Sequence, residues 1–108
     1  MSKYNSRKYT FHGEEFDSLK EYVRWRELFM LSLGGQIRNL QRQVKYELIP
    51  AQYIDGKCVE RSLCYIADFV YEAGGHEVVE DVKGFKTPEY VIKRKLMLYL
   101  KGIRIKET

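Results

Sequence analysis

The chain has 108 residues, of which 44% are hydrophobic and 31% are charged. This size and composition are typical of one globular domain, with room for about one sheet and two helices, and they exclude multi-domain mechanisms. The 19 Lys and Arg residues exceed the 15 Asp and Glu residues, which gives a net charge of +4. Such an excess suits a polyanionic partner such as nucleic acid, although ordinary soluble domains often carry it too.

The two cysteines, Cys58 and Cys64, form no CxxC pair and are too few for the disulfide framework of a small secreted domain. The longest unbroken apolar stretch near the N-terminus, Leu28 to Leu31, is far shorter than the roughly 20 residues of a membrane helix. Nothing in the sequence resembles a signal peptide. We therefore expect a soluble, cytoplasmic protein.

Residues 1–10 are predicted to form a flexible basic arm, because basic side chains stand there among small polar residues without periodic apolar positions. Such an arm could touch DNA, but fraying of a terminus is the simpler interpretation. The remaining residues, 11–108, are predicted to form a single domain.

The stretch from Ser18 to Leu33 is predicted to form the first helix, which Gly34 and Gly35 end. Aromatic residues at helical spacing are more often core than a platform for stacking bases, so we expect this face to be buried. The apolar face comprises Leu19, Tyr22, Trp25, Leu28, Phe29 and Leu31.

Three strands are predicted after this helix. Residues Ile37 to Ile49 contain apolar positions that alternate with polar ones, which is the period of a half-buried strand. Ala51 to Glu60 is interpreted as a connecting loop or turn. The second and third strands are expected at Ser62 to Tyr71 and at His76 to Lys83, joined by a glycine turn.

A second helix is predicted from Thr87, a capping hydroxyl followed by Pro88, to about Lys101. Gly102 ends this helix, and Ile103 to Lys106 alternates as a last short strand. The order of elements is therefore αβββαβ. The buried stripe of the second helix is expected at Ile92, Leu96, Tyr99 and Leu100.

The hairpin of the second and third strands predicts a pair of acidic residues. If its loop is centred on Gly74 and Gly75, paired positions have numbers that sum to 149, which sets Asp68 opposite Asp81. Directly opposed side chains on one face lie about 4.5 to 5.5 Å apart at Cβ, and like charges there need compensation. A bound cation would provide it, because one or two carboxylates with water and phosphate oxygens commonly hold Mg²⁺.

Lys83 is expected beside this pair, since it lies two residues beyond Asp81 and therefore on the same face of the strand. A metal there would polarise a phosphodiester, and the lysine would stabilise charge that develops in the transition state. The alternative is that Asp68 and Lys83 are solvated surface charges. The apolar residues Ile66 and Val70, expected on the face of Asp68, argue against it because they should shelter the acid.

Around these residues the chain reads Tyr65-Ile-Ala-Asp-Phe-Val70 and Val78-Val-Glu-Asp-Val-Lys-Gly84. This pattern resembles the PD-(D/E)xK nuclease superfamily, with Asp68 as the first acid and Asp81, Val82 and Lys83 as the (D/E)xK triplet. Ala67 replaces the proline of the motif, as in many members. The resemblance implies a restriction-endonuclease-like α/β fold, an αβββαβ core in which two helices flank a mixed central sheet. It is closest to short phage-encoded members related to Holliday-junction resolvases.

The resemblance also implies roles for individual residues. Asp68, Asp81 and the backbone carbonyl of Val82 would bind Mg²⁺ or Mn²⁺, and Lys83 would assist the water or the transition state. Glu21 in the first helix would be a further catalytic and metal-binding residue. A structural alternative for Glu21 is that Ser18 and Glu21 form a capping box that only closes the helix start.

Three basic residues near the second helix, Lys86, Lys93 and Lys95, are candidates for contacts with nucleic-acid phosphates. Lys93 is the best of them, because many relatives place a polar or basic residue of this helix near the site. Solvation at the surface is the alternative for at least one of them. Glu80 is expected on the face opposite Asp81, where it would be structural.

The function expected from these features is that of a metal-dependent DNA endonuclease. The resemblance alone implies a phage origin and branched or junction DNA as a substrate. The alternative is a non-catalytic DNA-binding or assembly protein that retains a nuclease fold. Relatives often act as pairs that cut two strands, so a homodimer is expected.

Overall fold

The structure is a computed structural model that describes residues 8–108, and neither of its two helices is long and apolar enough to cross a membrane. Without its two small hairpins, β1–β2 and β4–β5, the order of elements is α1-β3-β6-β7-α2-β8, which is the predicted αβββαβ. The elements are β1 (Tyr9–Phe11), β2 (Glu14–Phe16), α1 (Leu19–Leu33), β3 (Arg38–Ile49), β4 (Gln52–Ile54), β5 (Lys57–Glu60), β6 (Leu63–Ala73), β7 (His76–Asp81), α2 (Pro88–Lys101) and β8 (Lys106–Glu107).

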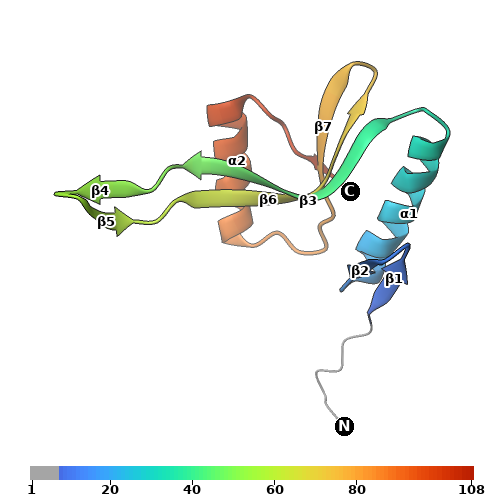
Figure 1. Ribbon diagram of the computed structural model, residues 1–108, viewed down its shortest axis with the longest axis horizontal. Helices are drawn as coiled ribbons and strands as arrows, with labels where there is room; N and C mark the ends of the chain where they lie inside the picture. The colour runs from blue at the N-terminus through green and yellow to red at the C-terminus, as the bar shows by residue number, and fades with distance from the viewer. Residues whose placement is uncertain (1–7) are drawn as a thin grey trace, which may run out of the picture.

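The central sheet is mixed, as predicted, with strand order β3-β6-β7-β8. The β3/β6 and β6/β7 pairs are antiparallel, and the β7/β8 pair is parallel. The two long strands β3 and β6 form a ribbon that carries the β4–β5 hairpin at its far end, while β7 leaves this ribbon at an angle (Figure 1). The two helices lie on either side of that branching point.

Both helices begin and end as the sequence predicts. The hydroxyl of Ser18 accepts a hydrogen bond from Glu21 N at the start of α1, and Thr87 caps α2 in the same way through Tyr90 N. At its end, α2 closes with Gly102 in the left-handed conformation at φ 67°, which glycine adopts without steric cost.

Two apolar clusters form the core. One packs α1 against Phe69 and Tyr71 of β6 and contains the predicted core residue Trp25, with Tyr22 packed against it. The other packs α2 against the opposite side of the sheet. Its buried members are Leu48, Tyr65, Ala67, Val70, Val79, Tyr90, Met97 and Ile105.

The β6–β7 hairpin has the predicted register. Val70 pairs with Val79, and Phe69 pairs with Glu80, so that paired positions sum to 149. The turn uses Gly74 and Gly75 at φ 58° and 81°, which is the backbone that a tight hairpin requires. The strand β7 ends at Asp81 and not at Lys83 as predicted.

The alternation of β6 changes sides at Asp68, and the prediction for Ile66 and Val70 is wrong for this reason. Ala67 and Val70 belong to the α2 cluster, whereas Phe69 faces the α1 cluster. Gln43, opposite Asp68 in the register of β3 and β6, has a positive φ of 57°, which breaks the regular pleat there. Ile66 is therefore 52% exposed while Val70 is buried, so the two do not shelter Asp68 together.

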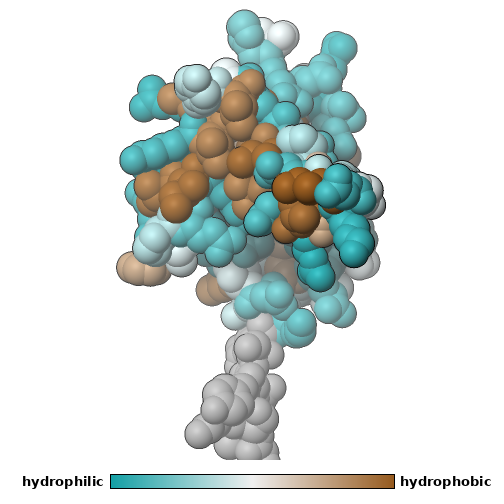
Figure 2. Space-filling view, turned by 90° about the vertical axis from the view of Figure 1, so that its left-hand side faces the viewer, coloured by the Kyte–Doolittle hydropathy of each residue, from teal (hydrophilic) through white to brown (hydrophobic). Residues whose placement is uncertain are grey.

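The predicted buried stripe of α2 is also wrong. Tyr90 and Met97, seven residues apart, face the sheet instead, and of the predicted stripe only Leu96 packs against the core. Tyr99 is 86% exposed, and Leu98 is exposed beside it. Figure 2 shows apolar side chains gathered on this side of the molecule, where α2 and the β4–β5 hairpin lie.

Three smaller elements differ from the prediction. Ala51 to Glu60 is not a plain loop but contains the β4–β5 hairpin, turned by Asp55 and Gly56 at positive φ. The β1–β2 hairpin was not predicted, and it contains Tyr9 and Thr10 of the expected arm; residues 1–7 of the arm lie outside the described residues. The last strand is β8 at Lys106–Glu107 and not at Ile103 to Lys106, because Ile103 and Ile105 turn into the core before the chain meets β7.

Candidate functional site

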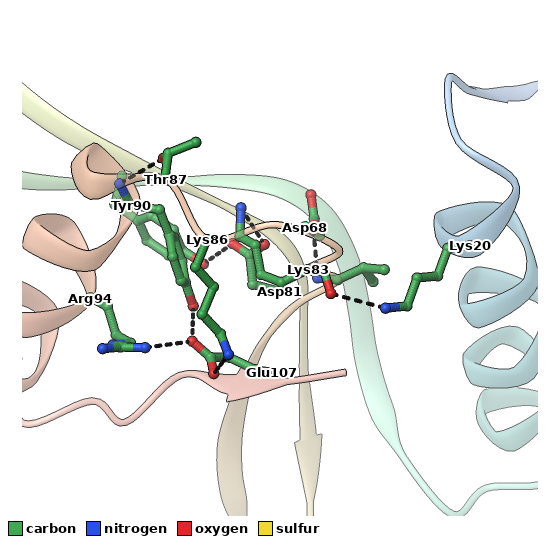
Figure 3. A network of polar contacts seen from close by, with 11 residues as sticks. Lys20, Asp68, Asp81, Lys83, Lys86, Thr87, Tyr90, Arg94 and Glu107 are labelled. Carbon is green, nitrogen blue, oxygen red and sulfur yellow. Dashed lines mark hydrogen bonds and ion pairs between the residues drawn. The ribbon is translucent and has the colours of Figure 1, made fainter.

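The site lies where β6 and β7 diverge. Asp68 is one position beyond the last paired residues of the hairpin, so the register sets it opposite Asp81. Its Oδ2 accepts a hydrogen bond of 2.8 Å from the backbone N–H of Val82. This bond ties the carboxylate of β6 to the end of β7, and the two acidic residues meet at the branching point (Figure 3).

The carboxyl group of Asp68 is in an unfavourable place for a negative charge. Burial raises the pKa of Asp68 to about 7, and the nearby carboxylates of Asp81 and Glu21 act in the same direction. The hydrogen bond from Val82 N opposes this rise. A cation at Asp68 would therefore stabilise the ionised form at neutral pH.

Asp81 is 2% exposed. Its Oδ2 accepts a hydrogen bond from the hydroxyl of Tyr65, which holds the carboxylate in one orientation. Its Oδ1 is buried and accepts no hydrogen bond, although Lys83 Nζ lies 3.0 Å away in a direction outside hydrogen-bond geometry. A buried acceptor without a donor is rare, and a bound ion or water is one explanation for it.

Lys83 reaches this pair although β7 has ended. Its ammonium lies 3.0 Å from Asp81 Oδ1 and 4.2 Å from the centre of the Tyr90 ring, a cation–π contact that fixes it over α2. Its backbone is also held, because Lys20 Nζ donates to the Lys83 carbonyl at 2.9 Å and Lys83 N donates to Thr108 O at 3.1 Å.

Glu21 on α1 interacts electrostatically with Asp81 and Lys83 of this site. Burial raises the pKa of Glu21, Asp81 raises it further, and Arg42 and Lys83 lower it. The Ser18 hydroxyl caps α1, but among the hydrogen bonds of residues 8–108 the Glu21 carboxylate accepts none. The reciprocal bond of a capping box is thus missing there, which leaves this carboxylate available.

The donor set fits a divalent cation held by two carboxylates. Asp68 and Asp81 offer oxygen ligands, one of them buried without a hydrogen bond, and Mg²⁺ commonly takes one or two carboxylates with waters completing the shell. Within the described part of the chain, no three His, Cys, Asp or Glu side chains are grouped to hold a metal. The role of Glu21 as a further metal ligand stays a prediction.

A cavity of about 330 Å³ opens between these residues and the first two turns of α2. Lys93 lies in it, in an ion pair of 2.9 Å with Glu89. Lys86 and Lys95, the other predicted nucleic-acid contacts, do not line it: Lys86 lies 3.4 Å from Glu107, and Lys95 lies in a separate pocket. The cavity is lined by Cys64, Tyr65, Ile66, Asp68, Asp81, Lys83, Thr87, Glu89, Tyr90 and Lys93.

Two aromatic residues of the site were not predicted. Tyr65 bonds to Asp81, and Tyr90 supports Lys83 with its ring while its hydroxyl donates to Glu107 at 2.7 Å. Both are core residues by their burial. The one sequence signal for Tyr65 was its position three residues before Asp68. In a regular strand that spacing puts the two side chains on opposite faces, so it does not indicate a contact at the site.

Glu80 has the structural position predicted for it, on the α1 side of the sheet. It is fully buried, and Arg24 holds both of its oxygens at 2.7 and 2.9 Å. Tyr71 also donates to it. Burial raises the pKa of Glu80, but the hydrogen bonds from Arg24 and Tyr71 outweigh this and lower it overall.

A family model described as "Protein of unknown function (DUF1064)" matches residues 1–106. The chain belongs to the DUF1064 family. No curated protein and no solved structure matches this DUF1064 chain.

Proposed function

We propose that the protein is a metal-dependent nuclease that hydrolyses DNA phosphodiester bonds. The observation that supports this most is the hairpin register that opposes Asp68 and Asp81 with Lys83 Nζ 3.0 Å from Asp81. Two acids and a lysine at the end of a hairpin are the chemical groups that metal-assisted phosphodiester hydrolysis needs.

We propose further that the core is restriction-endonuclease-like. The α1-β3-β6-β7-α2-β8 order and the mixed sheet between two helices support this assignment. In such a fold the two acids lie on adjacent central strands, which agrees with their places on β6 and at the end of β7.

Each residue would have a distinct task. Asp68 and Asp81 would hold Mg²⁺ or Mn²⁺, and the backbone carbonyl of Val82 is a proposed third ligand. The ion, when bound, supplies Lewis-acid polarisation of the phosphate and lowers the pKa of an attacking water. Lys83, fixed by the Tyr90 ring, would stabilise the negative charge that develops on the phosphoryl oxygens. Glu21 would orient water from the α1 side.

Lys93 would contact the substrate, because its ammonium lies in the same cavity as the carboxylate pair. Glu89 currently neutralises it, and a phosphate can replace that exposed partner at little cost. Branched or junction DNA as the preferred substrate, a phage source and a homodimeric state are proposed on the resemblance to Holliday-junction resolvases alone.

The test is cleavage of supercoiled plasmid and of a four-way DNA junction in Mg²⁺, in Mn²⁺ and in EDTA. We expect wild-type protein to cut only with metal and Asp81→Ala to lose cleavage by at least about a hundredfold. Asp55→Ala, in the exposed β4–β5 turn, is the matched control and should cut like wild type.

Equal cleavage by wild type and Asp81→Ala would overturn the assignment. Salt-dependent DNA binding without cleavage in either metal would favour the other function considered, a non-catalytic DNA-binding protein with a nuclease-like fold.

A further inference from the structure

A second pocket, of about 680 Å³, lies beside the candidate active site between α2 and the C-terminal segment. We call it the basic pocket. It has four cationic side chains, one acid and two apolar residues. The residues that line it are Arg94, Lys95, Leu98, Arg104, Ile105, Lys106 and Glu107.

Most of the positive charge in the basic pocket is unpaired. Among the ion pairs of residues 8–108, none involves Lys95, Arg104 or Lys106. Arg94 pairs with Glu107 at 3.1 Å, and Lys86 and Tyr90 also contact that carboxylate. Three of the four cations of the pocket are therefore without an ion-pair partner among the described residues.

A hydrogen bond joins the wall of the candidate active site to the wall of the basic pocket. Tyr90 lines the cavity of Asp68 and Asp81, and its hydroxyl bonds to Glu107 at the edge of the basic pocket. Arg94 follows Tyr90 by one turn of α2, about 6 Å along the helix axis. Figure 3 shows Lys86 reaching from the side of the carboxylate pair to Glu107, with Arg94 beyond it.

We propose that the basic pocket binds the phosphate backbone of the nucleic-acid strand that occupies the candidate active site. A strand of a duplex rises about 3.4 Å per nucleotide, so about two nucleotides span the turn of α2 from Tyr90 to Arg94. Lys95, Arg104 and Lys106 would each contact phosphate oxygens, while the half-exposed Leu98 offers an apolar surface to a sugar.

This inference rests on the proposed function for its substrate class, but its test does not depend on cleavage. The measurement is fluorescence anisotropy of a labelled single-stranded DNA 20-mer in EDTA, over a series of salt concentrations. The variant is Lys95→Ala with Arg104→Ala, which leaves Lys106 in place because Lys106 also acts on the buried Glu80. The control, Arg38→Ala with Lys57→Ala, removes the same charges from β3 and β5.

Loss of one phosphate contact on a single strand lowers the salt slope of binding by about 0.7, so we expect a decrease of about 1.4 for the double variant. The control should bind DNA within about twofold of the wild-type affinity. The charge-preserving variant Lys95→Arg with Arg104→Lys should keep the salt slope of wild type. Thermal unfolding of all variants checks that they are folded.

Equal slopes for the variant and the control would overturn the proposal, as would the absence of DNA binding by wild type. The two hypotheses fail separately. If no metal supports cleavage but the double variant loses binding, the nuclease assignment fails and the basic pocket stands. If wild type cuts DNA and the double variant binds normally, the basic pocket fails alone.

Discussion

Asp68 is a half-buried acid whose pKa is raised well above that of a surface carboxylate. Its pKa of about 7 in the folded protein lies above the value of about 3.9 in an unfolded chain. The folded state therefore holds the proton more tightly, and this contribution to stability is present at low pH and is lost as the pH rises through about 7.

Replacing Asp68 with Asn should remove this pH dependence. We expect the free energy of unfolding of the metal-free wild type to fall, relative to that of Asp68→Asn, as the pH rises from about 4 to about 7. Asn can still accept the hydrogen bond from Val82 N. Urea unfolding in EDTA across this pH range measures the difference, and a constant difference would contradict the burial argument.

Tyr65 is expected to position Asp81. Tyr65→Phe removes the hydroxyl that holds Asp81 Oδ2. Loss of a hydrogen bond to a metal-binding carboxylate typically lowers metal affinity or activity by about 10- to 100-fold. Tyr46→Phe is the matched control: its ring stacks on Tyr65 at 6.4 Å, and its hydroxyl makes none of the hydrogen bonds of residues 8–108. The measurements are the initial rate of plasmid cleavage and the Mn²⁺ affinity of both variants. Equal values for Tyr65→Phe and Tyr46→Phe would refute the role of Tyr65.

At the scale of single residues, the sequence was sufficient to place those side chains whose positions depend only on local backbone geometry. The glycine turn and the two-residue period of a strand were enough to place Asp68 opposite Asp81 and Glu80 on the other face. They could not place Tyr65, because it contacts Asp81 from a strand whose alternation changes sides at Asp68, opposite the positive φ of Gln43 on β3.

At the scale of elements, the ion pair of Arg24 and Glu80 connects α1 to β7 directly behind the site. Arg24→Ala would leave a fully buried carboxylate without its charge partner, which typically costs about 3 to 5 kcal/mol of unfolding free energy.

The control for Arg24 is Glu27→Ala, which removes only the exposed second partner of Arg24 and should cost less than about 1 kcal/mol. Chemical denaturation of both variants tests the claim. A loss for Arg24→Ala no larger than that for Glu27→Ala would show that β7 does not depend on this contact.

The sequence predicted helices and long strands well but failed for the phase of α2 and for the short hairpins. Ile92, Tyr99 and Leu100 have helical spacing, yet the residues of α2 that are buried are Tyr90 and Met97. The Tyr90 hydroxyl bonds to Glu107 and its ring contacts Lys83, and a pattern of apolar residues does not reveal such polar contacts. The strands of β4–β5 are exposed throughout, so they have no alternation of burial that a pattern could reveal.

At the scale of the whole molecule, two acids, a lysine and two tyrosines meet in one cavity at the branching point of β6 and β7. The basic pocket lies beside this cavity. The order of elements predicted this meeting point from the sequence, since β6 and β7 are adjacent and α2 follows directly. The side that α2 presents and the parallel pairing of β8 depend on long-range packing, which periodicity does not encode.

The most direct test of the central claim is a crystal structure of the protein soaked in Mn²⁺, with anomalous data to locate the metal. We predict one ion bound by carboxylate oxygens of both Asp68 and Asp81, about 2.0 to 2.2 Å from each, and none in crystals of Asp81→Ala. Saturating Mn²⁺ without an ion between these two carboxylates would contradict the account.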